Sequence, residues 1–421
     1  MALELAFECP KTIHKLRSGP LRSLLDGFCQ WLFDRQYSRE TIRRHLGNVA
    51  HLNSYLGSAD SEARQKLTAR DVAGFFKQYP SFCRNRGPLE NHLSDVRHSV
   101  HRFVAYLEAD GRFDRLVARP IYQSLLDSYL DWMRQHQHAT EGTLDVRKHS
   151  ITRFLAWLGP QATSMGLGKL TANQVEKFII AYAEDIGRAG RHSMQSALRT
   201  FMRFGLHAGH FSDRLDLAVP TLRTYKLATV PRGLNAEQAC QILASIDRRK
   251  ASGRRDYAIL QLLYNYGVRG GQVRGLRLDD IQWARNRILF RALKHGKDSL
   301  LPLTASVGGS LLDYLKTSRP PSDRPEIFLT CRAPYRPLSQ SSNLAEIVCR
   351  HIRVSGLNVP CRGAHAFRHG FATRMVAEGH SLKAVADVLG HRHLSTTFLY
   401  TKVDFAALQQ VALEWPQEGI T

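Results

Sequence analysis

The chain has 421 residues, and its 59 lysine and arginine residues against 37 aspartate and glutamate residues give a formal net charge of +22. This length exceeds one ordinary domain, so we expect about two or three separate hydrophobic cores. The positive charge is spread along the chain, which indicates a folded surface that meets a polyanion such as nucleic acid. Basic ribosomal and membrane-surface proteins share this composition, so the motifs must decide between them.

The N-terminal segment, the lengths of the apolar stretches and the cysteines argue against a secreted, a membrane-spanning and a disulfide-rich or zinc-binding protein. Residues 1–20 carry Glu4, Glu8 and Lys11 and contain no apolar run of signal-peptide length. No later stretch approaches the ~18 consecutive apolar residues of a membrane span, so we expect a soluble, cytoplasmic protein. The seven cysteines are scattered and contain no Cys-x-x-Cys pair, which argues against a disulfide framework and a thiolate zinc site.

An internal repeat of about 100 residues covers the first half of the chain. The matched segments agree in residue type and order: 24–26 with 125–127, 55–57 with 157–159, 67–69 with 170–172, and Phe103, Gly111, Phe113 and Pro120 with Phe201, Gly209, Phe211 and Pro220. So many matches in order indicate two copies of one domain.

Apolar spacing predicts four helices in each copy. In the second copy we expect them at 121–134, 141–158, 171–184 and 191–208. Thr68 with Asp71, and Thr171 with Gln174, have the spacing of N-terminal capping pairs for the third helix of each copy. The sequence therefore predicts two all-helical domains, over residues 1–119 and 120–224.

Basic residues cluster on the second and fourth predicted helices of each copy. One interpretation is a solvated helix face, and the other is contact with a DNA groove or its phosphates. The candidates for DNA contact are Arg43, Arg44, Arg147, Lys148, Arg191 and Arg199.

Residues 225–233 include Pro231, Gly233 and several basic positions, so we expect a linker there. Asn235 then has the spacing of a helix cap with Gln238. A third domain is expected over residues 234–421.

The third domain contains short motifs in a fixed order. Arg269 follows an apolar helix at a glycine-rich turn, and two β-branched or apolar runs around a His-Gly turn predict a β-hairpin with Lys294 near its tip. His365 and Arg368 are three positions apart at a predicted helix start, so they share one face. His391 and Tyr400 follow.

This ordered set resembles the tyrosine recombinase, or phage integrase, family. The resemblance begins near Gly233, and the duplicated helices resemble the family's core-binding domain occurring twice. It implies a mainly α fold with a small antiparallel sheet, in which two all-helical DNA-binding domains precede an α+β catalytic domain. The duplication departs from the family's usual arrangement. Gln272 departs as well, because the position three after the first motif arginine is commonly acidic.

The chemistry of strand cleavage explains these residue types. Two guanidiniums, Arg269 and Arg368, clamp the charge that develops on the non-bridging oxygens of the phosphate. Tyr400 is the expected nucleophile, and His365 is the expected base, because a tyrosine hydroxyl has a pKa of about 10 and must lose its proton. Lys294 is the candidate for protonating the departing 5′ oxygen, with Lys297 as the alternative.

The resemblance implies that His391 hydrogen-bonds a non-bridging oxygen. His369 and His393 are further candidates for contact with DNA. A zinc site on His365, His369, His391 and His393 is disfavoured, because no glutamate follows in a His-Glu-x-x-His pattern and Arg368 would repel the cation. The phosphotyrosine linkage conserves the energy of the broken bond, so no nucleotide, metal or other cofactor is expected.

Three functions remain as alternatives. The leading hypothesis is a site-specific recombinase that acts on double-stranded DNA with paired sites, in a homo- or hetero-tetramer joined through a C-terminal helix bearing Phe405, Leu408, Val411 and Leu413. It would be nucleoid-associated and serve DNA integration or transposition of a mobile element. A type IB topoisomerase and a catalytically idle DNA-binding regulator are the others.

Overall fold

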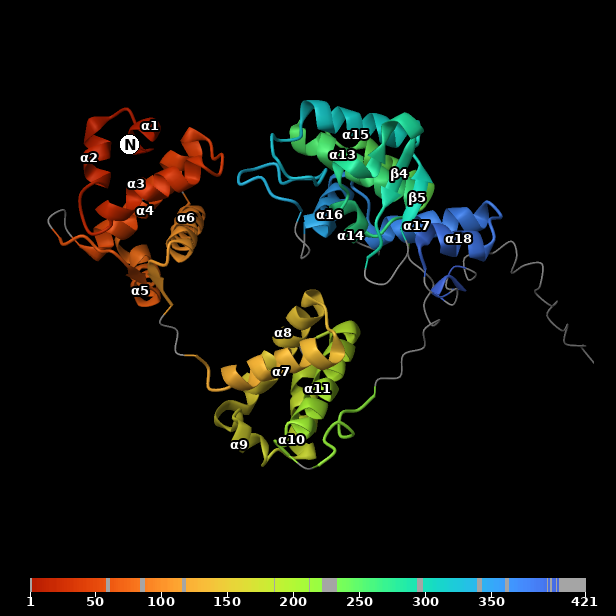
Figure 1. Ribbon diagram of the computed structural model, residues 1–421, viewed down its shortest axis with the longest axis horizontal. Helices are drawn as coiled ribbons and strands as arrows, with labels where there is room; N and C mark the ends of the chain where they lie inside the picture. Colours follow the sequence, from red (N-terminus) through yellow and green to blue (C-terminus); the bar gives the residue numbers. More distant parts are fainter. Residues whose placement is uncertain are drawn as a thin grey trace, which may run out of the picture. The chain divides into compact units, whose positions relative to one another are not determined.

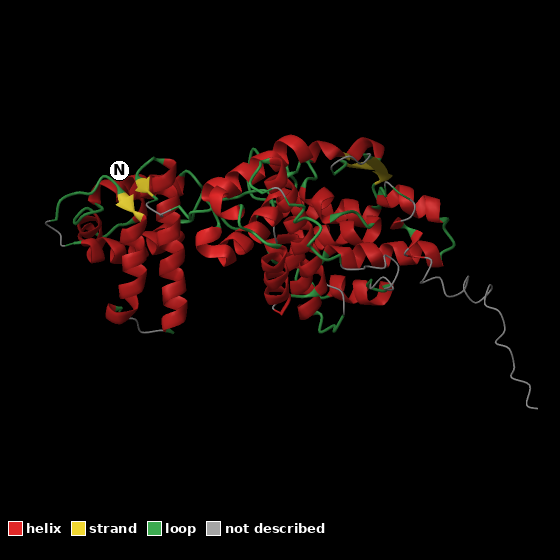
Figure 2. Cartoon of the chain, turned by 90° about the horizontal axis from the view of Figure 1, so that it is seen from below, coloured by secondary structure: helices red, strands yellow, loops and turns green. Residues whose placement is uncertain are grey.

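The computed structural model describes residues 2–57, 61–83, 88–115, 119–184, 186–211, 213–221, 233–293, 298–338, 343–359, 363–391, 393, 396–398 and 400. The chain forms two compact units, one of Met1–Asp114 with Lys226–Thr421 and one of Arg115–Tyr225. The fold is mainly α-helical with small β-sheets, which confirms the predicted class (Figure 2). No helix within the described residues is long and apolar enough to cross a membrane.

Residues 2–114 form a first helical bundle. Its helices are α1 (Ala2–Ala6), α2 (Pro10–Leu16), α3 (Arg22–Phe33), α4 (Arg39–Leu56), α5 (Ala69–Phe82) and α6 (Leu89–Ala109). Ser38 caps α4, and the predicted Thr68–Asp71 capping box begins α5. Strand β1 (Leu67–Thr68) pairs in parallel with β2 (Phe113–Asp114), a contact that the sequence analysis did not predict.

Residues 119–221 form a second helical bundle of α7 (Gln123–Gln137), α8 (Glu141–Leu158), α10 (Ala172–Glu184) and α11 (Arg188–His207), with the short α9 (Ser164–Leu167) between α8 and α10 (Figure 1). The four predicted helices are confirmed, with ends shifted by up to three residues. Thr171 and Gln174 exchange the predicted capping hydrogen bonds at the start of α10. Tyr129 and Phe201 anchor the core of this bundle.

Residues 233–400 form the C-terminal region, and the 225–233 linker lies outside the described residues apart from Gly233. Its helices are α12 (Ala236–Ala244), α13 (Ala251–Tyr266), α14 (Gly270–Arg274), α15 (Ala305–Thr317), α16 (Asn343–Val354), α17 (Ala364–Ala377) and α18 (Leu382–Leu389). The predicted Asn235–Gln238 capping box begins α12. Helix α13 is buried along much of its length and packs against α15 and α17, so it forms the centre of this region.

A three-stranded antiparallel sheet lies beside α13, in the order β3 (Ile281–Gln282), β4 (Arg287–Phe290) and β5 (Ser299–Pro302). Ile288 and Phe290 alternate inward from β4 and are fully buried. Strands β4 and β5 confirm the predicted hairpin. Tyr266 packs its ring against Phe290 and donates from its hydroxyl to the carbonyl of Pro302, which fixes the hairpin to the end of α13.

Candidate active site

The end of α13 places Arg269. Gly267 ends the helix in the left-handed conformation, at φ +58°, where a Cβ would also collide with Phe371. Arg269 then caps α14, and its backbone N–H donates to Oε1 of Gln272 at 3.0 Å. The Gln272 amide donates in turn to the carbonyl of Arg291 at 3.3 Å, a bond that a carboxylate at this position would be unable to donate. The departure at Gln272 therefore supports the local packing of Arg269.

Two guanidiniums converge on the end of α18. Arg269 Nη1 donates to the carbonyl of Gly390 at 3.2 Å, and Arg368 Nη2 donates to the carbonyl of Leu389 at 2.8 Å. Arg368 Nη1 also reaches the carbonyl of Gly267 at 2.9 Å. These bonds tie α13, α17 and α18 together. They also bring two guanidiniums, the groups that can bind a phosphate in bidentate fashion, to the same end of α18.

These two cations have no carboxylate partner within the part of the chain that the structure describes. Arg368 is only 5% exposed. Burial, followed by the nearby charge of Arg269, lowers the pKa of the Arg368 guanidinium to about 10. A buried cation beside a second, half-buried cation is costly, and an anion bound by both would relieve that cost. The site is therefore built for an anionic ligand.

Tyr400 lies next to this pair of cations. Its ring is 2% exposed and belongs to a small hydrophobic cluster with Ala372, Val376, Val385 and Leu389. Its hydroxyl is 2.8 Å from Nδ1 of His369. Burial raises the pKa of Tyr400, and Arg368 opposes this shift, so the phenol is protonated at neutral pH.

The other predicted histidines lie around the same point. His365 and His369 are on one face of α17, with 6.3 Å between ring centroids, and His365 is the more exposed of the two. Partial desolvation, then Arg368 and Arg269, lowers the pKa of His365. His391 Nδ1 is 2.7 Å from the hydroxyl of Thr397. Burial, then Arg368 and Arg269, lowers the pKa of His391 to about 4, so its ring is neutral at neutral pH.

Lys294 and Lys297 lie outside the described residues, as does the predicted C-terminal helix with Phe405. The described base of the hairpin is well anchored. The N–H of Ala292 donates to Oδ1 of Asp298 at 2.7 Å across the turn, and Arg291 pairs with the buried Asp280 at 2.7 Å.

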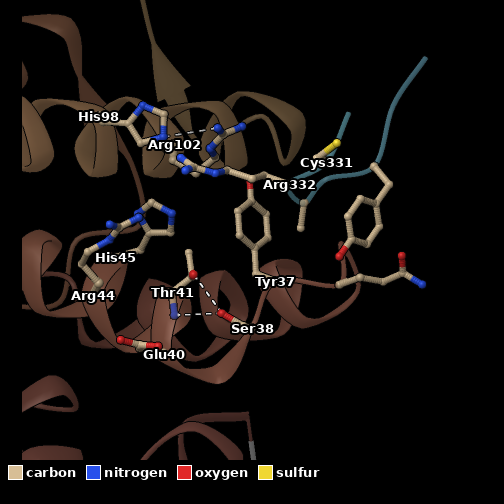
Figure 3. A pocket seen from close by; sticks show the side chains of 13 residues that line it. Tyr37, Ser38, Glu40, Thr41, Arg44, His45, His98, Arg102, Cys331 and Arg332 are labelled. Atoms are coloured by element: carbon tan, nitrogen blue, oxygen red, sulfur yellow. Dashed lines mark hydrogen bonds between the residues drawn. The ribbon is translucent and has the colours of Figure 1, made fainter. Parts of the chain in front are cut away.

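Among the DNA-contact candidates of the first bundle, Arg43 is engaged within the protein. Its Nε donates to the carbonyl of Ala6 at 2.5 Å, and a terminal nitrogen lies 3.5 Å from Glu8. Arg44 is exposed, and it lines a pocket with His45, His98 and Arg102 (Figure 3). The sequence analysis did not single out Arg102, which extends the basic surface around Arg44 onto α6, or His98, whose ring lies beside it.

In the second bundle, too, some candidates for DNA contact form hydrogen bonds within the protein and others are exposed. Arg199 Nη2 donates to Val219, Pro220 and Thr221, so this guanidinium holds the segment that leaves the bundle. Arg147 donates to Ser196, and Arg191 Nε donates to the carbonyl of Ile186. Lys148 is exposed on α8.

Sequence reasoning missed three contacts in the site: Thr397 on His391, Gln272 beneath Arg269, and His369 on the hydroxyl of Tyr400. His369 and His391 were singled out, but for contact with DNA. Within the described residues there is no group of three or more histidine, cysteine or acidic side chains that could hold a metal ion.

Comparison with known proteins identifies the family to which the chain belongs. Residues 232–407 match the model of the phage integrase family. The chain is 31% identical over 406 residues to integrase/recombinase y4rA of Sinorhizobium fredii, covering 95% of this chain and 96% of that protein. It is 26% identical to tyrosine recombinase XerD of Listeria innocua, covering 68% of this chain and 96% of that protein.

Solved structures share the fold. A lambda integrase (75–356) dimer bound to a COC′ core site superposes with a TM-score of 0.52 at 18% identity, covering 71% of this chain and 99% of that chain. The XerH recombinase in its post-cleavage complex with palindromic difH DNA gives a TM-score of 0.51 at 18% identity, covering 82% and 95%. The full-length similarity to y4rA, together with these folds, places the chain in the phage integrase family of tyrosine recombinases.

Proposed function

We propose that this tyrosine recombinase breaks one DNA strand by attack of the Tyr400 hydroxyl on the scissile phosphate, and reseals it through the resulting 3′-phosphotyrosyl linkage. The observation that carries the proposal is the convergence of Arg269 and Arg368, two cations without a carboxylate partner in the described residues, beside a buried tyrosine hydroxyl. Preorganised donors of this kind stabilise the charge that develops in phosphoryl transfer.

Each side chain has one role in this reaction. Arg269 and Arg368 bind the non-bridging oxygens, because bidentate guanidiniums match their geometry. His391 donates from Nε2 to one of these oxygens, since its Nδ1 is taken by Thr397. His365, on the exposed side of α17, receives the proton of Tyr400 when DNA is bound, and Lys294 protonates the departing 5′ oxygen.

We propose that the two helical bundles correspond to DNA-binding domains over residues 1–119 and 120–224, followed by a 225–233 linker and a catalytic domain over 234–421. Arg44, Lys148 and Arg191 are the strongest candidates for phosphate contact, because they are exposed. Arg43, Arg147 and Arg199 are half-buried and bond within their own bundle, which makes them weaker candidates.

The assembly we propose is a homo- or hetero-tetramer on two double-stranded sites, joined through the segment after Tyr400, and acting on nucleoid DNA in the cytoplasm. The XerH and lambda integrase structures named above contain DNA, which supports DNA as the partner here. A type IB topoisomerase and an idle regulator are not favoured, because the similar proteins are named integrases and recombinases.

The test maps the cleavage site and the nucleophile together. The purified protein is incubated with sheared genomic DNA of its host and denatured in detergent, and the DNA that remains attached to protein is sequenced. We expect adducts at a small set of sequences, and none with Tyr400→Phe, which removes one oxygen and retains the ring.

A nicked suicide duplex built from the mapped sequence then allows cleavage to be timed. A Tyr400→Phe protein that still forms adducts would show that another residue is the nucleophile. Adducts scattered evenly over the genome, with relaxation of any supercoiled plasmid, would favour the topoisomerase.

A further inference from the structure

The hydroxyl of Tyr400 has one described hydrogen-bond partner, the ring of His369. The two atoms lie 2.8 Å apart, and the ring centroids are 5.7 Å apart. The apolar side chains of Val376, Val385 and Leu389 belong to the same cluster as the tyrosine ring, so the hydroxyl is the polar end of a buried side chain. A buried hydroxyl that lost its partner would carry a desolvation penalty.

The direction of this hydrogen bond follows from the two protonation states. Burial raises the pKa of Tyr400, so its hydroxyl retains its hydrogen and needs an acceptor. Burial, then the neighbouring His365 and Arg368, lowers the pKa of His369, so its ring is neutral and one nitrogen is free to accept. The hydroxyl therefore donates to Nδ1, and the proton of the imidazole is on Nε2.

Helix α17 holds His369 rigidly. Its neighbour Arg368 is bonded to the carbonyls of Gly267 and Leu389. Gly370 packs so closely on the backbone of Leu234 that a Cβ would lie 2.1 Å from the Leu234 carbonyl oxygen. Tyr400, in contrast, lies outside α17 and beyond the end of α18 at Leu389. The hydrogen bond thus ties the nucleophile to a fixed point on α17 beside the two guanidiniums.

We propose that His369 is a positioning residue that holds the hydroxyl of Tyr400 in place for attack. The inference rests on Tyr400 being the nucleophile, as proposed above. His365 and His369 then divide two roles between them. His369 orients the oxygen from inside the protein, while His365, one turn earlier and more exposed, faces incoming DNA and receives the proton. In the resting site the single hydrogen of the phenol is donated to Nδ1 of His369. In the DNA complex it turns about the C–O bond to His365, which takes the proton as the oxygen of Tyr400 joins phosphorus. The bond from phosphorus to the 5′ oxygen breaks, and that oxygen leaves with a proton from Lys294.

Two substitutions separate orienting the hydroxyl from accepting its proton. Asparagine at 369 can place its Oδ1 near the position of Nδ1 and accept the same hydrogen bond, but it is not a base. Alanine can do neither. On the nicked suicide duplex, we expect His369→Ala to slow single-turnover cleavage by about 100-fold, the scale of loss for a reacting group displaced by about 1 Å. We expect His369→Asn to recover to within about tenfold of the unaltered protein, with the same affinity for DNA.

The pH dependence of cleavage gives a second readout. If His369 only orients the hydroxyl, the acidic inflection of the rate profile stays in His369→Asn, because the proton acceptor is another group. His365→Ala is the matched comparison on the same helix face, and it should remove that inflection.

Several results would overturn the proposal. A His369→Ala protein that cleaves within roughly threefold of the unaltered rate would show that the hydrogen bond does not position the nucleophile. A His369→Asn protein that is as slow as the alanine variant, or that loses the inflection, would make His369 the proton acceptor instead. If His369→Ala fails to fold, the asparagine variant alone decides by its rate and inflection. Adduct formation by Tyr400→Phe would instead refute the nucleophile itself, whatever the histidine variants do.

Discussion

Thr397 offers a sharp test of how His391 is prepared for its role. The side chain of Thr397 is fully buried, and its hydroxyl is 2.7 Å from Nδ1 of His391. Because the His391 ring is neutral, a hydroxyl that donates to Nδ1 keeps the proton on Nε2, the nitrogen left to donate to phosphate. Thr397→Val retains the shape and removes this bond. A net hydrogen bond contributes about 0.5–1.5 kcal/mol. Each 1.36 kcal/mol corresponds to a tenfold change in rate, so we expect cleavage to slow by about two- to tenfold.

The assay is single-turnover cleavage of the suicide duplex, with Thr396→Val, an exposed neighbour, as the matched control. His391→Ala alone should cost roughly 10²- to 10³-fold, as the loss of one oxyanion donor does. In that background, Thr397→Val should have no further effect, because the group that it orients is gone. An equal loss with and without His391 would refute the reasoning and give Thr397 a purely structural role.

Three other predictions concern the hairpin, the first bundle and its buried histidine. Lys294→Ala should cleave poorly on ordinary DNA but recover on DNA with a bridging 5′ sulfur, which leaves without a proton; equal defects on both would implicate Lys297. Arg44→Ala should lower the slope of log affinity against log salt by about 0.9, while an unchanged slope would mean that this surface does not meet phosphate. His45 is 1% exposed, and burial, followed by the charge of Arg44, lowers its pKa to about 4. Below about pH 6.5, His45 therefore binds a proton in the unfolded chain but stays neutral in the folded chain. The free energy of unfolding should therefore fall by about 2 kcal/mol more between pH 7 and pH 5 in the unaltered protein than in His45→Gln, as measured with urea; parallel curves would contradict this.

The parts of the fold that depend on neighbouring residues were predictable. A capping box involves two positions three apart, so Thr68 with Asp71 and Asn235 with Gln238 follow directly from the sequence. The hairpin follows from two apolar runs around a turn. The β1–β2 pairing does not, because Leu67 and Phe113 are far apart in sequence and each strand has only two residues.

Contacts inside the site could not be predicted either, because the residues that meet there are also far apart in sequence. His369 and Tyr400 are 31 residues apart, and the motif order gives no measure of which of two histidines on α17 meets the hydroxyl. The pattern of charged residues in the sequence also does not show whether a basic side chain already forms hydrogen bonds within its own chain. Arg199 and Lys148 were equivalent candidates for DNA contact, but Arg199 bonds its own chain at Pro220 while Lys148 is exposed.

In this site the arginines supply permanent positive charge, and the histidines are the groups that can accept a proton. The arginines carry the charge: even with its pKa lowered to about 10, Arg368 is protonated throughout the physiological range. Burial, and then the same two guanidiniums, lower the pKa of His365 and, to about 4, that of His391. The histidines are therefore neutral before DNA binds, and a neutral imidazole is the form that can accept a proton from a phenol. An incoming phosphate would reduce the positive field, and so raise the affinity of these histidines for a proton, at the point where Tyr400 must release one. In the proposed mechanism, the two arginines that clamp the phosphate thus also leave His365 neutral before DNA binds and able to take the proton of Tyr400 in the complex.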